Sequence, residues 1–347
     1  MKAIITVLVL LIALPVFAQS DEIDDAKLLD LLKQRDEIKK QMESANASGD
    51  YDKYKELEVT WNDLDTKIKN REQLIVDKKK EAKRLLDDAS LLRRDKKYAQ
   101  AKEKYEKLAG MGEFIGKDKI PGIKLMVAFC MERLKDYPGA KKVYGEVIAL
   151  DPSDAKAYSG KARCMAKMGE YSDAVTFYQK AIEIDSKDYK NYFFIAESYE
   201  KIEMFNKAEE NYALATITDP TYYKAWYNLG VLRFKMKKYE TALEALSTAV
   251  KSDPSSSQEF YKAYTLSAQI NNTIGNYTAA MDAAESAINL KANYGPAYLE
   301  KGIAQEKSEK YNLAIQSFEK CLNDRNCRDS AQWHINLIKE KYLQPQQ

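Results

Sequence analysis

The sequence predicts an all-α protein in which a pair of helices is repeated along most of the chain. An aromatic residue recurs at steps of 39, 34, 34, 34, 38 and 34 residues, and an alanine follows three residues after each one. The composition agrees, because 24 tyrosines against 13 glycines favour packed helices over a sheet with many turns. The recurring aromatics are Tyr98, Tyr137, Tyr171, Phe205, Tyr239, Tyr277 and Tyr311.

Residues 1–18 have the features of a secretory signal. A lysine is followed by an apolar run and then by the small residue Ala18. The run is shorter than the ~20 residues of a membrane-spanning helix, so we expect cleavage after Ala18, with an uncleaved anchor as the alternative. The segment resembles bacterial signals, and we therefore expect an exported protein, periplasmic or secreted.

Residues 20–81 predict a helical hairpin. Apolar residues recur at spacings of three and four residues in two stretches. The first stretch includes Leu28 and the second includes Leu57. Between them lies a polar loop, 44–50, whose Gly49 suits a helix end and whose Asp50 suits a helix start. Two such helices should pack antiparallel. The hairpin either caps the first repeat or acts as a coiled-coil arm for self-association.

Seven repeats follow, each with small residues where its two helices should cross. The eighth residue of every repeat is Ala or Gly, and the twentieth is always Ala. Small side chains at both places allow the helix axes to approach closely. The repeats are 82–115, 121–154, 155–188, 189–222, 223–256, 261–294 and 295–328.

A last helix, 329–343, is expected to cover the exposed apolar face of the seventh repeat. Polar residues stand at the eleventh position of the last three repeats, as Arg233, Asn271 and Gln305. These polar side chains put the packing density of the C-terminal half of the array in doubt.

The repeated segment, written out as GEYSDAVTFYQKAIEID for residues 169–185, resembles the tetratricopeptide repeat family. The resemblance implies a helical solenoid that binds proteins without catalysing a reaction. It also implies that the first helices line a concave groove, with ligand contacts mainly from the second, fifth, ninth and twelfth residues of each repeat.

Charge and chemistry exclude several function classes. There are 55 basic and 53 acidic residues, so no overall field attracts nucleic acid. The single histidine, His334, has no partner for metal binding or for a catalytic triad. We therefore expect no enzyme activity and no cofactor, and no membrane span in the mature protein.

The four cysteines divide into two pairs. Cys321 and Cys327 are six residues apart, and in an oxidising compartment they either form a disulfide or remain thiols. Cys130 and Cys164 occupy the tenth position of adjacent repeats, which the resemblance implies is a small, buried position. Stacked helices hold such residues ~8–10 Å apart, too far for a disulfide.

By the groove positions that the resemblance implies, we predict a protein-binding surface with a basic edge beside aromatic anchors. Such a surface suits an acidic peptide with apolar anchors, although solvated lysines would give the same pattern. The predicted residues are Lys156, Lys190, Lys224, Lys262, Phe129, Phe193, Tyr227 and Phe234.

Two functions remain open at this stage. One is a scaffold of the cell envelope or periplasm that binds a peptide or protein segment in the groove. The other is a structural component that forms homo-oligomers through the arm. The order of signal, coiled coil and repeats resembles that of periplasmic proteins that coordinate envelope constriction with wall synthesis.

Overall fold

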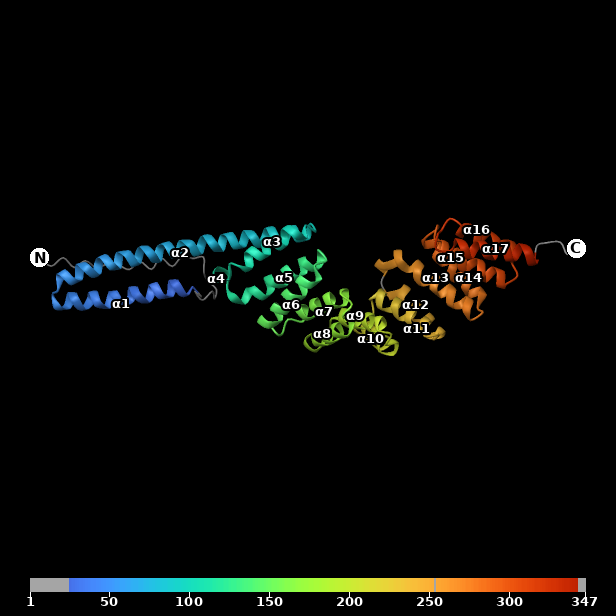
Figure 1. The fold of residues 1–347 in the computed structure, drawn as a ribbon, viewed down its shortest axis with the longest axis horizontal. Coiled ribbons are helices and arrows are strands. Elements are labelled where there is room, and N and C mark those ends of the chain that lie inside the picture. The colour runs from blue at the N-terminus through green and yellow to red at the C-terminus, as the bar shows by residue number, and fades with distance from the viewer. Residues whose placement is uncertain (1–24, 253, 343–347) are drawn as a thin grey trace. The chain divides into compact units, whose positions relative to one another are not determined.

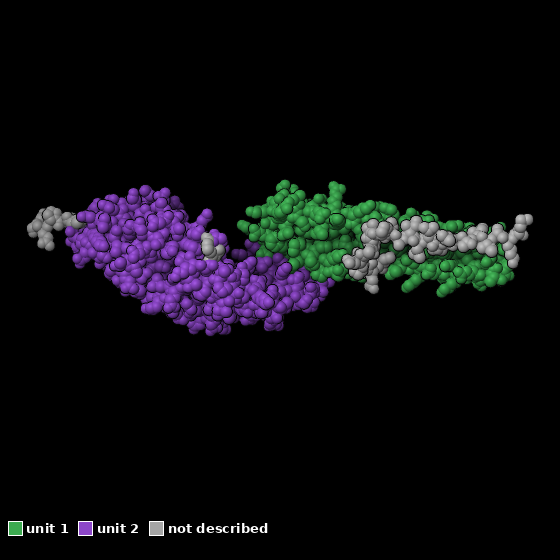
Figure 2. Space-filling view, turned by 180° about the vertical axis from the view of Figure 1, so that it is seen from behind, with its two compact units in different colours: residues 1–136 green, residues 137–347 purple. Residues whose placement is uncertain are grey.

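The computed structural model describes residues 25–252 and 254–342 (Figure 1). The predicted signal, 1–18, lies outside the described residues. Every regular element of the described ranges is a helix. The chain forms two compact units, residues 1–136 and 137–347 (Figure 2), and each is described by itself.

The N-terminal unit begins with two long helices that lie side by side (Figure 1). Gly49, at φ 76°, ends the first helix in the left-handed conformation, and the Asp50 carboxylate accepts a hydrogen bond from the Lys53 amide. Leu57, Leu64 and Ile68 are buried along the seam. The elements of this unit are α1 (Ala26–Ser48), α2 (Tyr51–Arg94), α3 (Tyr98–Ala109), α4 (Gly112–Ile115), the 3₁₀-helix η1 (Lys117–Lys119) and α5 (Ile120–Arg133).

The boundary expected between arm and first repeat, at residue 81, lies inside α2. No glycine or proline interrupts the sequence from Tyr51 to Arg94, so nothing ends the helix there. Arg71 of α2 holds the start of α1, donating to the Asp25 carboxylate at 2.7 and 3.0 Å, and it also pairs with Glu113 of α4. The second helix of the arm and the first helix of the first repeat are therefore one continuous helix, α2.

The C-terminal unit is a succession of antiparallel helix pairs, each packed on the next. Its elements are α6 (Tyr137–Leu150), α7 (Ala155–Lys167), α8 (Tyr171–Ile184), α9 (Tyr189–Lys201), α10 (Phe205–Thr218), α11 (Tyr223–Lys235), α12 (Tyr239–Ser252), the 3₁₀-helix η2 (Pro254–Glu259), α13 (Phe260–Thr273), α14 (Tyr277–Leu290), α15 (Gly295–Lys307), α16 (Tyr311–Cys321) and α17 (Arg328–Tyr342).

The helices of a pair cross at the small residues. The alanine at the twentieth position of each repeat is fully buried, and so is each alanine at the eighth. Where the eighth residue is glycine, side chains of the opposite helix leave no room for a Cβ atom. A Cβ on Gly230 would lie 2.7 Å from Leu246 Cγ, and one on Gly302 would lie 2.5 Å from Phe318 Cε1.

In every repeat, one residue of the turn between the two helices has the left-handed backbone conformation, always at the same position of the repeat. Glycine occupies this position in two of the repeats, as Gly169 and Gly275. The other five repeats place Lys or Glu at φ of 59° to 66°, which costs about 1–2 kcal/mol per residue. These residues are Lys96, Lys135, Glu203, Lys237 and Glu309.

The polar residues at the eleventh position of the last three repeats form hydrogen bonds. Arg233 donates to the Glu209 carboxylate at 2.9 Å. Asn271 is buried and donates to the Ser267 carbonyl, and buried Gln305 accepts from the Ser317 hydroxyl at 2.7 Å. Each of the three polar side chains therefore has a hydrogen-bond partner in the helix layer.

Helix α17 covers the last pair. Its Ile335 and Ile338 are buried against a cluster that includes Phe318 of α16. His334 stacks on the Phe318 ring at 4.8 Å, and its Nδ1 lies 2.5 Å from a Glu306 carboxylate oxygen. Leu343, at the predicted end of this helix, lies outside the described residues.

Candidate functional site

A pocket of about 380 Å³ opens between the first helices of the fourth, fifth and sixth repeats. Helix α9 contributes Phe193, Phe194 and Glu197, and α11 contributes most of the remaining wall. The full lining is Phe193, Phe194, Glu197, Tyr222, Tyr223, Lys224, Tyr227, Asn228, Glu259 and Lys262.

The pocket lies where the repeat period is broken. The fifth and sixth aromatics are 38 residues apart instead of 34, and η2 occupies the extra length. The Tyr223 hydroxyl donates to the Glu259 carbonyl at 3.1 Å, and its ring lies 5.3 Å from that of Phe260. These contacts hold the end of η2 against α11, so the inserted segment supplies one wall.

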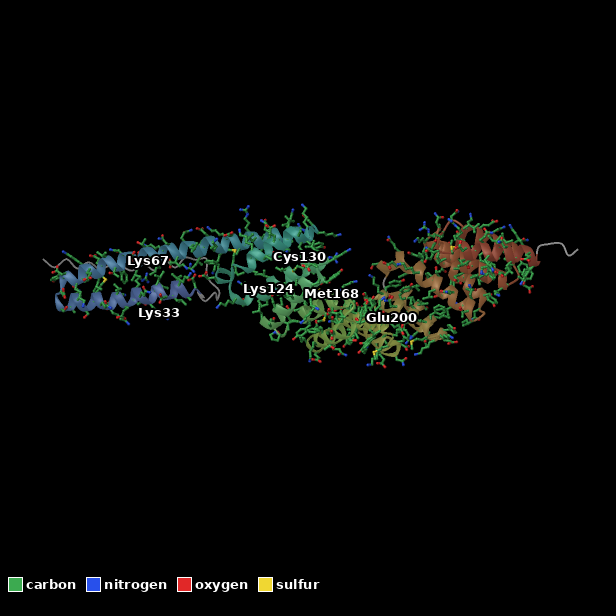
Figure 3. All side chains as sticks on the ribbon, viewed as in Figure 1. Lys33, Lys67, Lys124, Cys130, Met168 and Glu200 are labelled. Atoms are coloured by element: carbon green, nitrogen blue, oxygen red, sulfur yellow. A yellow bond between two sulfur atoms is a disulfide. The ribbon has the colours of Figure 1, made fainter. Side chains whose placement is uncertain are left out.

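Aromatic rings form most of the apolar surface. The Tyr223 and Tyr227 rings stack at 5.9 Å and 16°. Phe193 meets the Tyr222 ring edge-on at 5.3 Å and the Tyr212 ring at 5.5 Å. Behind this layer the Tyr212 hydroxyl donates to Glu200, labelled in Figure 3, at 2.7 Å. The rings are therefore held from both sides before any ligand binds.

Burial among these rings keeps the tyrosine hydroxyls protonated. It raises the pKa of Tyr222 to about 12 and raises the pKa of Tyr227 as well. The walls thus present neutral hydroxyls over the physiological pH range.

Two acidic and two basic side chains line the pocket, and they differ in whether they form a salt bridge. Burial lowers the pKa of Lys262, but the hydrogen bond that Lys262 donates to Glu259 at 3.3 Å outweighs this and raises its pKa overall. Glu197 makes no hydrogen bond or salt bridge with any described residue. Desolvation by its neighbours raises the pKa of the Glu197 carboxyl, and the charges of Lys167, Lys201 and Lys224 act in the opposite direction.

Four of the eight predicted groove residues line this pocket: Phe193, Tyr227, Lys224 and Lys262. Lys156 and Lys190 are exposed near the starts of α7 and α9, outside its lining. Phe234 instead packs on Tyr239, with ring centroids 6.0 Å apart, and Phe129 packs on Tyr98 in the N-terminal unit at 6.2 Å. These two phenylalanines serve helix packing.

Phe193 also differs from expectation. We predicted that Phe193 lies on the binding surface as an aromatic anchor, yet only 5% of it is exposed and it belongs to a core cluster with Leu229. Its neighbours Tyr212 and Tyr222 enclose the ring because the junction between the fourth and fifth repeats is unusually rich in aromatics.

Sequence reasoning missed several lining residues. Glu197 stands at the ninth position of its repeat, one of the groove positions, and could have been named from the pattern. Glu259 could not, because it belongs to the insertion. Tyr222 closes the fourth repeat, where the pattern gives no groove role.

Cysteine and metal chemistry add little at this surface. The Cys321 and Cys327 Cα atoms are 6.0 Å apart and their sulfurs are bonded, while Cys130 and Cys164 are buried outside any disulfide. The described ranges contain no group of three or more His, Cys, Asp or Glu residues placed to hold a metal ion. Among the helices that the structure describes, none combines the length and apolar character needed to cross a membrane.

Comparison with known proteins identifies the repeats. Models described as tetratricopeptide repeat match residues 133–193, 223–256, 261–294 and 295–323. The match over 261–294 has the bounds of the predicted sixth repeat. A search of curated proteins found no match.

Solved structures share the fold. The C-terminal part of a TPR repeat-containing protein from Cytophaga hutchinsonii is 19% identical, with a TM-score of 0.59 over 72% of this chain and 98% of that one. YrrB, described as a TPR protein with an unusual peptide-binding site, is 20% identical, with a TM-score of 0.48 over 55% of this chain and 96% of that one. The matched segments of this chain are therefore tetratricopeptide repeats, arranged in an all-helical solenoid.

Proposed function

We propose that the protein is a non-enzymatic scaffold that binds a segment of a partner protein on the first helices of its fourth to sixth repeats. The observation that carries this proposal is the pocket between α9, α11 and α13, whose aromatic walls are already packed in place. A rigid aromatic pocket gives a partner side chain apolar contact at low ordering cost. Tetratricopeptide repeat proteins generally act as interaction scaffolds, which agrees.

The partner segment would be acidic where it crosses α7 and α9. Lys156 and Lys190 are exposed there, and Lys224 stands at the rim of the pocket. None of the three makes a salt bridge with the described residues, so their charges remain available. Exposed charges of this kind steer and orient a partner more than they hold it.

The test is capture of partners from an envelope extract, followed by surface plasmon resonance on the captured protein. Replacing Lys156, Lys190 and Lys224 by glutamate should slow association and change its dependence on salt, because salt screens exposed charges. A matched control reverses three exposed lysines of second helices, Lys142, Lys251 and Lys320. Equal association rates for the two variants would reject the proposed surface.

The second candidate is an oligomeric component that associates through the arm. Large apolar residues are exposed on α1 and α2, with Val59 71%, Leu29 42% and Leu74 39% exposed. A second copy could cover them. Size-exclusion chromatography with light scattering tests this: Val59→Asp and Leu29→Lys should convert an oligomer to a monomer. A wild-type monomer at all concentrations would exclude it.

We further propose export, which rests on residues 1–18, and a disulfide between Cys321 and Cys327 in the exported protein. Fractionation should find the full chain outside the cytoplasm and a chain lacking residues 1–18 inside it. Mass spectrometry of unreduced peptides from the exported form should show the two cysteines linked. A cytoplasmic full-length protein with both thiols alkylated would contradict both proposals.

A further inference from the structure

The last connection of the C-terminal unit differs from the connections between repeats. The second helices of the second to sixth repeats each have 14 residues, whereas α16 has 11 and ends at Cys321. Cys327 comes directly before Arg328, the first residue of α17. The bond between the two sulfurs therefore links the end of the seventh repeat to the start of the helix that covers it.

The loop that this bond closes is packed directly against the start of α15. Gly295 is buried there, and a Cβ on it would lie 2.7 Å from Cys327 Sγ and would also meet the side chain of Asp324. Of the seven repeats, only the last begins with glycine. The sulfurs are shielded from solvent, with Cys321 0% and Cys327 2% exposed. A reductant therefore reaches the bond only when this end of the array opens.

Helix α17 is packed on one face only. Ala331, Ile335 and Ile338 are buried against a cluster that includes Phe318 of α16, whereas Trp333, on the opposite side of the helix, is 60% exposed. A helix held on one side at the end of a row of repeats opens at lower cost than a helix packed between two neighbours. A covalent link at its start restricts this opening, because the link limits how far the helix can move from α16.

From these contacts we infer that the disulfide between Cys321 and Cys327 is a redox latch on the end of the array. With the bond closed, α17 stays over the seventh repeat. With the bond reduced, α17 opens more often while the other repeats remain folded. The inference rests on the disulfide proposed above and adds the role of that bond. Opening uncovers Phe318 together with Leu299 and Ile303 of α15.

The reductant of this latch is a dithiol. One of its thiolates attacks a sulfur of the disulfide, and its second thiol then displaces the first from the mixed disulfide. Two electrons and two protons pass to this chain, so Cys321 and Cys327 become thiols while the dithiol becomes a disulfide. The reverse reaction closes the latch, since the two Cα atoms lie 6.0 Å apart in the folded loop.

Hydrogen bonds within the loop keep the two cysteines near each other after reduction. The Arg328 side chain donates to the Leu322 carbonyl at 2.8 Å, and the Asp324 amide donates to the Cys321 carbonyl at 2.9 Å. Neither hydrogen bond needs the disulfide. Reduction should therefore make α17 open more often without detaching it, and the effect should stay local because the bond spans only six residues.

Hydrogen exchange of the whole mature chain tests the latch, with mass spectrometry of the oxidised form and of the form reduced with dithiothreitol. Amides of residues 328–342 should exchange roughly tenfold faster after reduction, because loss of the link gives this end of the chain more freedom. Residues 171–184 and 205–218, in α8 and α10, should be unchanged. The double variant Cys321→Ser, Cys327→Ser should exchange like the reduced wild type with and without dithiothreitol, which excludes effects of the reductant elsewhere.

A linked pair of cysteines with equal exchange of residues 328–342 in both states overturns the latch. So does an equal increase of exchange in all helices after reduction, because the bond would then hold the whole unit and not its end alone. Two free thiols in the exported protein reject the proposed disulfide and the latch together. The scaffold function stands in each case, since the lining of the pocket between α9, α11 and α13 does not include these cysteines.

Discussion

We expect one buried residue, Glu300, to make the stability of the array depend on pH. Its side chain is 9% exposed, and burial raises the pKa of its carboxyl while the hydrogen bond from Asn272 acts against this. The Asn272 Oδ1 atom is buried and accepts no hydrogen bond in the described ranges. Because burial disfavours the charged carboxylate, the folded state favours the protonated form of Glu300.

We therefore expect Glu300→Gln to stabilise the protein at pH 7 by about 1 kcal/mol. Folding raises the pKa of Glu300, so the folded protein binds this proton more tightly than the unfolded chain does. The free energy of unfolding of the wild-type protein therefore falls as the pH rises above the ordinary pKa of a glutamate. Glutamine avoids this loss and can pair its amide with Asn272. Urea denaturation should show the advantage of the variant disappearing below about pH 4. A constant difference across pH would disprove the account.

Phe193 should be essential to stability as well as to the pocket wall. Because it is enclosed by Tyr212 and Tyr222, Phe193→Ala should cost about 3–5 kcal/mol. Tyr227→Ala, at the partly buried side of the pocket, should cost less. Thermal and urea denaturation followed by circular dichroism compare them. Equal losses of stability would mean that the two rings are equally buried. Tyr227→Ala would then be no better suited than Phe193→Ala to a binding test.

At the scale of the element, the crossing of two helices depends on alanine. Ala174 is fully buried in the third repeat, and its position is always alanine. Ala174→Leu should force α7 and α8 apart and cost about 1–3 kcal/mol. Ser172→Leu adds a leucine in the exposed first turn of α8 and should be nearly neutral. Identical melting temperatures would contradict this helix crossing.

The turns between paired helices offer a second test. Glu203 is exposed and holds φ at 59°, so Glu203→Gly should stabilise the protein by about 0.5–1 kcal/mol. The reverse change, Gly169→Ala, should destabilise it by a similar amount. A Cβ on Gly169 would contact nothing within 4 Å, so only backbone strain would act. Melting temperatures that move in the same direction for both variants would contradict the strain argument.

Regular elements were the most predictable part of the molecule. The position of Ala174 and its equivalents follows from helix crossing alone, and the all-helical solenoid follows from their period. The extent of α2 was less evident, because a repeat pattern marks a boundary in sequence even where no helix ends. The pocket was only half predictable: Lys224 and Tyr227 follow the period, but Glu259 belongs to an insertion that no period describes.

For the molecule as a whole, most repeats follow one period, and the proposed binding site lies at a junction where that period is broken. The helix pairs bury alanines and aromatics in the same way in each repeat, so neighbouring repeats differ little. Where η2 lengthens the connection, Lys262 of the sixth repeat meets residues of α9 and α11 around a pocket. We therefore expect the partner segment to bind at this junction.

Hydrogen exchange followed by mass spectrometry, with and without the captured partner, tests this placement most directly. Amides exchange slowly where a partner shields or rigidifies the helix, and the exchange is measured on this chain whatever the sequence of the partner. The account predicts added protection in segments 193–201, 222–228 and 259–266, with little change in residues 26–75. Protection confined to residues 26–75 would contradict it and would place binding on the arm.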